Sequence, residues 1–379
     1  MKSDAPVRFA ELDGLRGLAA LTVFFSHAVG TLPSSPLLDA LKSSPLRTTW
    51  DGAAAVGLFF VLSGFVLALA FVRDHKTLSY RDFLIRRCFR IFPAYWIALL
   101  LALILNFAAF NPNGLLGLSD WVTSLWANPI RLEDILRHIP LVVPLDTHRI
   151  DPVIWTMVFE MKISVIFPFA IVTLRTLPSA WGSAIVLVGA IAITGFGTAH
   201  RVMFLEALPE FVAGAILAQH SSRVIYSIRR WPFAVIASLL VVSLALYGKW
   251  LPLNLVEQYP RSSFHVSAIG GLMLITLTIS WQPLGSILKT GVYQSLGRIS
   301  YSFYLVHLPI LLASLSLIYP ILHSAMLTAS IALIVSLVFG SIMNKFIEIP
   351  AQNFGRIFTV RGFSLSTITF ALRKKQTQR

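Results

Sequence analysis

Long apolar blocks are the feature of this sequence that most restricts its fold. Hydrophobic residues make up 56% of the 379 residues and charged residues only 13%, and the apolar residues gather into runs of about 17 to 23. A soluble domain of this length carries about 25% charged residues, whereas apolar runs of this length are typical of helices that cross a lipid bilayer. We therefore predict an all-α integral membrane protein, folded as a bundle of about ten transmembrane helices.

The predicted spans leave little chain for a separate soluble domain. We assign residues 1–350 to the transmembrane domain and residues 351–379 to a basic cytoplasmic tail. The first apolar block contains a charge and no persuasive cleavage site, so we interpret it as a retained helix. The ten spans lie near residues 12–30, 56–72, 89–110, 153–174, 181–197, 202–219, 232–248, 264–281, 298–318 and 324–346.

The distribution of basic residues predicts the orientation of the bundle. The net charge is +14, which could attract nucleic acid, but the lysines and arginines collect in alternate connections between the apolar blocks. With the N-terminus in the cytoplasm, 22 of them lie inside and 8 outside. This bias follows the positive-inside rule. It predicts cytoplasmic termini, contact with membrane lipids and no binding of nucleic acid. The single cysteine, Cys88, cannot form an intrachain disulfide and supports no metal cluster.

Two ionisable residues in the first span are candidates for function. A polar group inside a span costs several kcal/mol unless it is paired or hydrated. Arg16 and His27 are eleven residues apart, which is about three turns, so they share a helix face and lie about 16 Å apart along the axis. A histidine can accept a proton from a hydroxyl group. A histidine hydrogen-bonded between helices is the structural alternative.

Three arginines stand at the predicted cytoplasmic end of the third span. Arg86, Arg87 and Arg90 precede its apolar part, and Arg87 and Arg90 are one turn apart on one face. Guanidinium groups bind phosphate in bidentate geometry. The alternative is an anchor that contacts lipid headgroups.

Further polar residues lie in the fourth and ninth spans. Glu160 and Lys162 point to different sides of their helix. Glu160 is expected at the depth of His27, where it would orient the imidazole; a structural ion pair between helices is the alternative. Tyr301, Tyr304 and His307 recur at intervals of three and share a broad face. That face would line a polar cavity or make hydrogen bonds between helices.

Six motifs in chain order carry a resemblance to a known family. They are Asp13-Gly-Leu-Arg16 with His27 after it, Gly57-Leu-Phe-Phe-Val-Leu-Ser-Gly-Phe65, Arg87-Cys-Phe-Arg90-Ile-Phe-Pro-Ala-Tyr95, Trp155 to Pro168 around Glu160, Ile299-Ser-Tyr301 to Pro309, and Glu348-Ile-Pro350. Together they resemble the membrane-bound acyltransferase-3 family, whose members commonly O-acetylate lipopolysaccharide, exopolysaccharide and other surface glycans. The resemblance covers essentially the whole chain and implies a multi-pass protein of the bacterial inner membrane.

The resemblance also implies roles for individual residues. The first-helix histidine, His27, is the expected catalytic residue, with Glu160 in the family's acidic position. Arg16, Arg87, Arg90 and Tyr95 are expected to bind acyl-CoA. Lys162, Tyr301, Tyr304 and His307 are expected to contact the acceptor. Lys162 and Ser164 stand where many relatives carry a neutral and an aromatic residue, which leaves the acceptor pocket less defined than the chemistry.

The function that follows is transfer of an acyl group, with acetyl-CoA as the expected donor, to a hydroxyl group of a carbohydrate or glycolipid. Direct transfer and an acyl-histidine intermediate both fit the residues. Many relatives carry an esterase-like domain after the last helix, which we do not expect here, so transfer is unaided or uses a separate glycan-assembly protein. No Gly-x-Ser-x-Gly elbow, metal-ligand spacing or phosphate-binding glycine loop is present. The alternatives are a transporter or flippase of a glycan or lipid-linked intermediate, and a non-catalytic scaffold.

Overall fold

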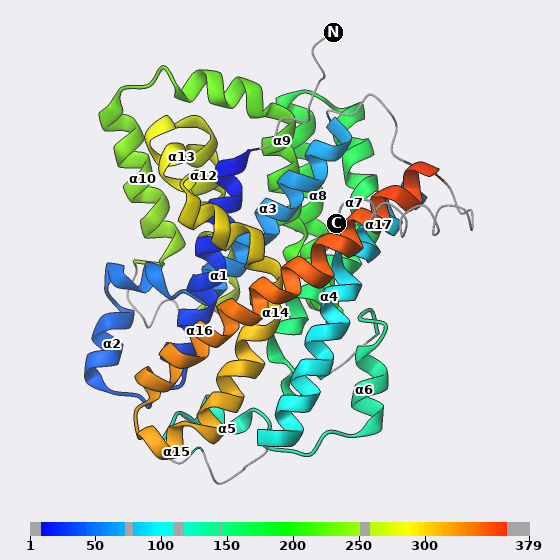
Figure 1. The fold of residues 1–379 in the computed structure, drawn as a ribbon. Coiled ribbons are helices and arrows are strands. Elements are labelled where there is room, and N and C mark those ends of the chain that lie inside the picture. Colours follow the sequence, from blue (N-terminus) through cyan, green and yellow to red (C-terminus); the bar gives the residue numbers. More distant parts are fainter. Residues whose placement is uncertain are drawn as a thin grey trace.

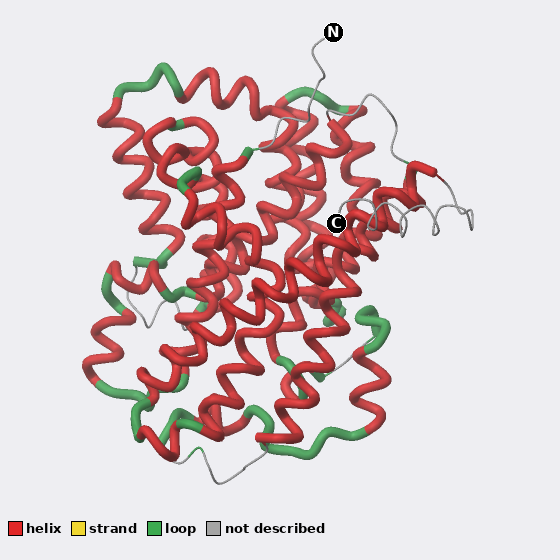
Figure 2. Tube along the Cα trace, viewed as in Figure 1, coloured by secondary structure: helices red, strands yellow, loops and turns green. Residues whose placement is uncertain are grey.

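The predicted all-α class is confirmed. The computed structural model describes residues 9–72, 79–109, 115, 117–143, 146–250 and 258–361, and every regular element in these ranges is a helix (Figure 2). The long helices are α1 (Ala10–Gly30), α3 (Gly52–Val72), α4 (Tyr80–Ala109), α7 (Trp155–Thr176), α8 (Ala180–Ala199), α9 (Leu208–Ile228), α10 (Phe233–Tyr247), α12 (Pro260–Ser280), α14 (Gly291–Leu317), α16 (Ala325–Met343) and α17 (Ile349–Arg361).

Short helices connect or extend these long ones. Figure 1 shows α5, α6 and α15 at one end of the bundle, the end where α1 stops and α7 starts. The short elements are α2 (Pro36–Lys42), η1 (Pro45–Thr49), α5 (Asp120–Ser124), α6 (Leu132–His138), η2 (Thr147–Arg149), η3 (Pro152–Ile154), η4 (Met203–Ala207), α13 (Gln282–Leu288), α15 (Tyr319–Leu322) and the π-helical turn η5 (Asn344–Glu348).

Each of the ten predicted spans coincides with a helix, and seven of these are long and apolar enough to cross a membrane. Helix α10 is apolar but has only 15 residues. Helices α1 and α9 have 21 residues each, and charges such as Arg16 and Glu210 lower their hydropathy. The sixth span was predicted from residue 202, but α9 begins at Leu208, because Pro209 favours the first turn of a helix.

Helix α14 is the central helix of the bundle. It packs against α1, α4 and α16 (Figure 1). Of its apolar window, 89% is buried, more than in any other candidate span of the described residues. The polar side chains of its buried part, which include Ser302, Tyr304 and His307, therefore face other parts of the protein rather than lipid.

Glycines allow two pairs of helices to approach closely. Gly64 of α3 lies against the Phe211 carbonyl of α9, and Gly214 of α9 lies against the Val61 carbonyl of α3. Gly17 of α1 and Gly297 of α14 form a similar contact. Small residues at such crossings are a common means of packing helices in membranes. These contacts fix α3 against α9, and α1 against α14.

Replacing Gly214 by alanine is expected to destabilise the bundle. The added Cβ would overlap the Val61 carbonyl oxygen and lie 2.7 Å from the Phe65 amide nitrogen, so α3 and α9 would have to separate. Overpacking of this kind costs about 1–3 kcal/mol. Thermal unfolding of the detergent-solubilised protein measures the effect. Gly189→Ala is the matched control, because a Cβ there meets nothing within 4 Å; equal melting temperatures of the two variants would contradict the assignment.

The chain after residue 350 continues as a helix. Helix α17 follows α16 through η5, and its Phe354 and Phe358 rings lie 5.3 and 6.1 Å from the ring of Phe89 on α4. Arg86 also donates from Nε to the hydroxyl of Thr359, at 2.8 Å. The first part of the predicted tail therefore packs on the bundle. Residues 362–379, the remainder of that tail, lie outside the described residues, as do Arg73 and Lys76.

Candidate active site

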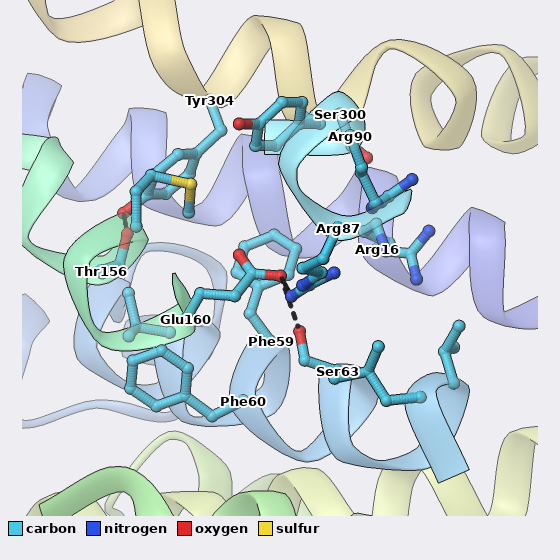
Figure 3. A pocket seen from close by; sticks show the side chains of 15 residues that line it. Arg16, Phe59, Phe60, Ser63, Arg87, Arg90, Thr156, Glu160, Ser300 and Tyr304 are labelled. Atoms are coloured by element: carbon cyan, nitrogen blue, oxygen red, sulfur yellow. Dashed lines mark hydrogen bonds and ion pairs between the residues drawn. The ribbon is translucent and has the colours of Figure 1, made fainter. Parts of the chain in front are cut away.

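A cavity of about 220 Å³ lies between α1, α3, α4, α7 and α14. Figure 3 shows three guanidinium groups gathered at one end of it and Thr156 and Tyr304 at the other. It brings together six of the ten predicted site residues. The lining side chains are Arg16, Val56, Phe59, Phe60, Ser63, Val66, Leu67, Arg87, Arg90, Thr156, Met157, Glu160, Ser300, Tyr301 and Tyr304.

Glu160 is paired with Arg87, which corrects one sequence prediction. The carboxylate forms an ion pair with the Arg87 guanidinium and lies 3.5 Å from the Ser63 hydroxyl. Arg87 donates from Nε to the Ser164 hydroxyl at 2.8 Å and is 6% exposed. The sequence predicts that Glu160 orients the His27 imidazole, but no contact joins these two described residues in the structure. A permanently charged guanidinium with several donors is the stronger partner for a carboxylate.

Arg16 and Arg90 are the more available cations of the cavity. Arg16 lies 3.4 Å from Asp13, one turn earlier on α1, and its side chain is 20% exposed. Arg90 lies over the Tyr301 ring, 5.9 Å from its centroid. Within the described residues no carboxylate lies at ion-pair distance from Arg90. These two guanidinium groups can therefore bind an anionic ligand, while Arg87 is held by Glu160.

His27 is the middle ring of a stack beside the cavity. Its ring lies 5.3 Å from His307 on α14 and 5.4 Å from Trp121 on α5, at interplanar angles of 27° and 6°. His307 is fully buried, and its Nδ1 lies 2.7 Å from the Tyr304 carbonyl oxygen. Its Nε2 has no partner among the described residues. The stack places an imidazole between the bundle core and the exposed indole of Trp121.

Tyr304 separates the histidine stack from the cavity. Its ring lines the cavity and lies 5.6 Å from His307 and 5.9 Å from Phe59. Its hydroxyl group lies 2.9 Å from the Thr156 hydroxyl and 3.3 Å from the Val153 carbonyl oxygen. The predicted helix face of Tyr301, Tyr304 and His307 therefore borders both the cavity and the stack. Tyr301 donates to the Ile91 carbonyl oxygen at 2.9 Å.

Two predicted site residues lie away from the cavity. Tyr95 is fully buried and donates to the His138 carbonyl oxygen of α6 at 2.6 Å, because it points to a different side of α4 from Arg90. Lys162 lies over the Phe204 ring, 5.5 Å from its centroid, on the opposite side of α7 from Glu160. Tyr95 thus links α4 to α6 through a hydrogen bond, and Lys162 contacts η4.

Sequence reasoning missed the hydroxyl groups of the cavity. Ser63 and Thr156 line it, and Ser164 holds Arg87. Ser63 lies within a quoted motif, and Ser164 stood out as a departure from the family pattern. Neither signal assigns a contact, because serine and threonine in helices often bond to their own backbone. Ser164 does so as well, with the Glu160 carbonyl oxygen at 2.6 Å.

The chain is similar to a known protein family and to several known proteins. The family model described as an acyltransferase domain matches residues 9–345. Acyltransferase MdmB of Streptomyces mycarofaciens is 27% identical, over 80% of this chain and 79% of the relative. Exopolysaccharide production protein ExoZ of Rhizobium meliloti is 28% identical, over 68% of this chain and 75% of the relative. Nodulation protein 10 of Rhizobium leguminosarum is 28% identical over 48% of each chain. No solved structure matches.

The family match extends over the helices that build the cavity and the histidine stack. It gives no support to the transporter interpretation. The model covers the motifs that carry Arg16, His27, Arg87, Arg90, Glu160 and His307 in their expected order. The chain belongs to the membrane acyltransferase-3 family and is an acyl-transferring enzyme.

Proposed function

We propose that this protein transfers an acyl group, expected to be acetyl, from cytoplasmic acyl-CoA to a hydroxyl group of a surface or exported carbohydrate. One observation carries the proposal: the cavity has available arginines at one end and a tyrosine packed on a histidine stack at the other. The relatives named for exopolysaccharide production and for nodulation support a carbohydrate acceptor.

The proposed topology has ten spans, both termini in the cytoplasm and the protein in the bacterial inner membrane. The bias of basic residues supports this orientation. In it, the arginine end of the cavity faces the cytoplasm, where acyl-CoA is made. The end with α5, α6 and Trp121 faces outward, where a carbohydrate chain arrives.

The donor would bind through its phosphates to Arg16 and Arg90. Both are charged and line the cavity, and neither is held in a buried ion pair as Arg87 is. The pantetheine arm would then run along the cavity towards Tyr304. Arg16 and His27 are about 16 Å apart along α1, a distance on the order of the length of that arm. The thioester would thereby reach the region of the stack.

In the proposed reaction His27 acts as general base. It takes the proton of the acceptor hydroxyl while the oxygen attacks the thioester carbonyl. The C–O bond forms, the C–S bond breaks, and the departing thiolate receives the proton from the imidazolium. The His307 ring stacks on His27 and supports its orientation. Glu160 would act by positioning Arg87 at the cavity wall.

Replacing Arg90 by alanine tests the donor site. We expect the KM for acetyl-CoA to rise about 10- to 100-fold with little change in kcat, because a charged hydrogen bond contributes about 1.5–3 kcal/mol. Arg90→Lys should recover part of the loss. The assay uses the purified protein in phospholipid nanodiscs, with release of free CoA as the readout. The exposed Arg229→Ala is the matched control. An unchanged KM in Arg90→Ala would exclude this phosphate site.

A further inference from the structure

A second cavity, of about 390 Å³, lies where α7, η4 and α12 begin. The proposed topology places this end of the bundle on the outer side. The cavity lies apart from the arginine end of the first cavity, and none of the predicted site residues lines it. Its lining combines four aromatic side chains with a carboxylate, a guanidinium and an imidazole: Phe60, Trp155, Phe159, Phe264, Glu206, Arg261 and His265.

The aromatic rings of this cavity meet at Phe60. The Phe60 ring is 6.3 Å from Trp155, at an interplanar angle of 83°, and 6.4 Å from Phe264, at 64°. The Phe159 ring is also 6.3 Å from Phe60, at 18°. Trp155 is 38% exposed, although it belongs to a packed helix. The rings thus form an aromatic wall, in which Trp155 and Phe264 stand at large angles to Phe60 and Trp155 is partly exposed.

Polar groups of both charges stand beside this wall. Glu206 is 18% exposed and lies 3.5 Å from Arg261, whose side chain is 59% exposed. His265 Nδ1 lies 2.6 Å from Glu210, which holds the imidazole in place. The second carboxylate oxygen of Glu210 is buried without a partner among the described residues. Glu206 and His265 are therefore each paired beside the aromatic rings, and Arg261 is the most exposed of the three polar groups.

This combination matches the chemistry of a sugar. A pyranose ring presents C–H groups on its face and hydroxyl groups around its rim. The face of an aromatic ring carries negative charge density and suits the C–H groups. Carboxylate and guanidinium groups accept from and donate to the hydroxyls. An acyl chain offers no hydrogen-bonding groups to Glu206 and Arg261. A simple anion is too small and too polar to pack against four aromatic rings.

We propose that this second cavity binds a saccharide unit of the acceptor. The inference rests on the proposed function and adds the place at which the carbohydrate is held. Phe60 forms part of the wall of both cavities. Trp155 lines the second cavity and its neighbour Thr156 the first. A sugar chain held at the outer site would thus lie next to the cavity that receives the acyl group.

The test measures binding of oligosaccharides prepared from the de-O-acylated surface polysaccharide of cells that lack this protein. Saturation-transfer NMR on protein in phospholipid nanodiscs avoids competition from sugar detergents. We expect Phe264→Ala to weaken binding about tenfold or more, because an aromatic ring that packs against a ligand carries a large share of the affinity. Phe264→Tyr keeps the ring and should bind like the wild type. Arg90→Ala should also leave this binding unchanged.

A second substitution tests the polar side of the site. Glu206→Gln removes the charge while keeping the shape, and it should weaken binding severalfold. Glu133→Gln changes an exposed carboxylate of α6 and is the matched control. No binding by the wild type, or equal binding by wild type and Phe264→Ala, would overturn the saccharide site. If binding follows the prediction but no acetyl group is transferred, the saccharide site stands and the proposed function fails.

Discussion

His27→Ala is expected to lower the rate of acyl transfer by about 10²- to 10⁴-fold. This is the range contributed by a positioned general base. The loss should fall on kcat, with the KM for acetyl-CoA nearly unchanged, because in the proposed site the donor binds to Arg16 and Arg90, which line the cavity, whereas His27 lies beside it. Initial rates with the purified protein and the oligosaccharide acceptor measure both constants.

The matched control for this prediction is His200→Ala. His200 is exposed and stacks on Phe196, four residues earlier on α8. Its replacement should leave the rate unchanged. Equal membrane amounts of the His27 and His200 variants would exclude a folding defect. A His27→Ala enzyme with more than half of the wild-type rate would remove His27 from the chemistry.

Arg87→Met is expected to be the most destabilising of the cavity substitutions. It leaves the Glu160 carboxylate without its ion-pair partner. The site is largely buried, since the Arg87 side chain is 6% exposed and the Glu160 side chain 15%. Breaking a buried pair by removing one partner costs about 3–5 kcal/mol. We expect a lower melting temperature in detergent and a reduced amount of protein in the membrane.

The double variant Arg87→Met with Glu160→Gln separates charge from packing. It removes the unpaired carboxylate and should recover much of the stability without recovering activity. Arg86→Met is the matched control, since Arg86 is one position earlier and bonds to Thr359 at the edge of the bundle. A double variant that is no more stable than Arg87→Met would show that the ion pair does not determine the stability of this region.

The helices were predictable from the sequence because their signal is local. Apolar runs such as 56–72 and 298–318 predict helices that can cross a membrane from their own residues alone. The start of α9 was not predicted, since four of the five residues in the preceding 3₁₀ turn at Met203–Ala207 are also apolar. The count of spans rests on α1, α9 and α10, whose charge or length makes them marginal in isolation.

The candidate site was predicted in its members but not in its pairings. The motifs identified Arg16, Arg87, Arg90 and Glu160, which the fold brings to one cavity. The partner of Glu160 is set by the packing of α7 against α4, and no local pattern encodes that contact. The carbonyl partner of Tyr95 lies in α6, 43 residues away. Such contacts depend on tertiary structure.

Mass spectrometry of surface glycans shows whether this protein O-acylates a carbohydrate in the cell and whether His27 is required. The samples are cells with the wild-type protein, a deletion strain, and the deletion strain complemented with the His27→Ala or His200→Ala variant at equal membrane amounts. We predict that an acetyl-sized mass on a glycan is lost on deletion, stays absent with His27→Ala and returns with His200→Ala. Glycan masses identical in all strains, or an acetyl group restored by His27→Ala, would contradict it.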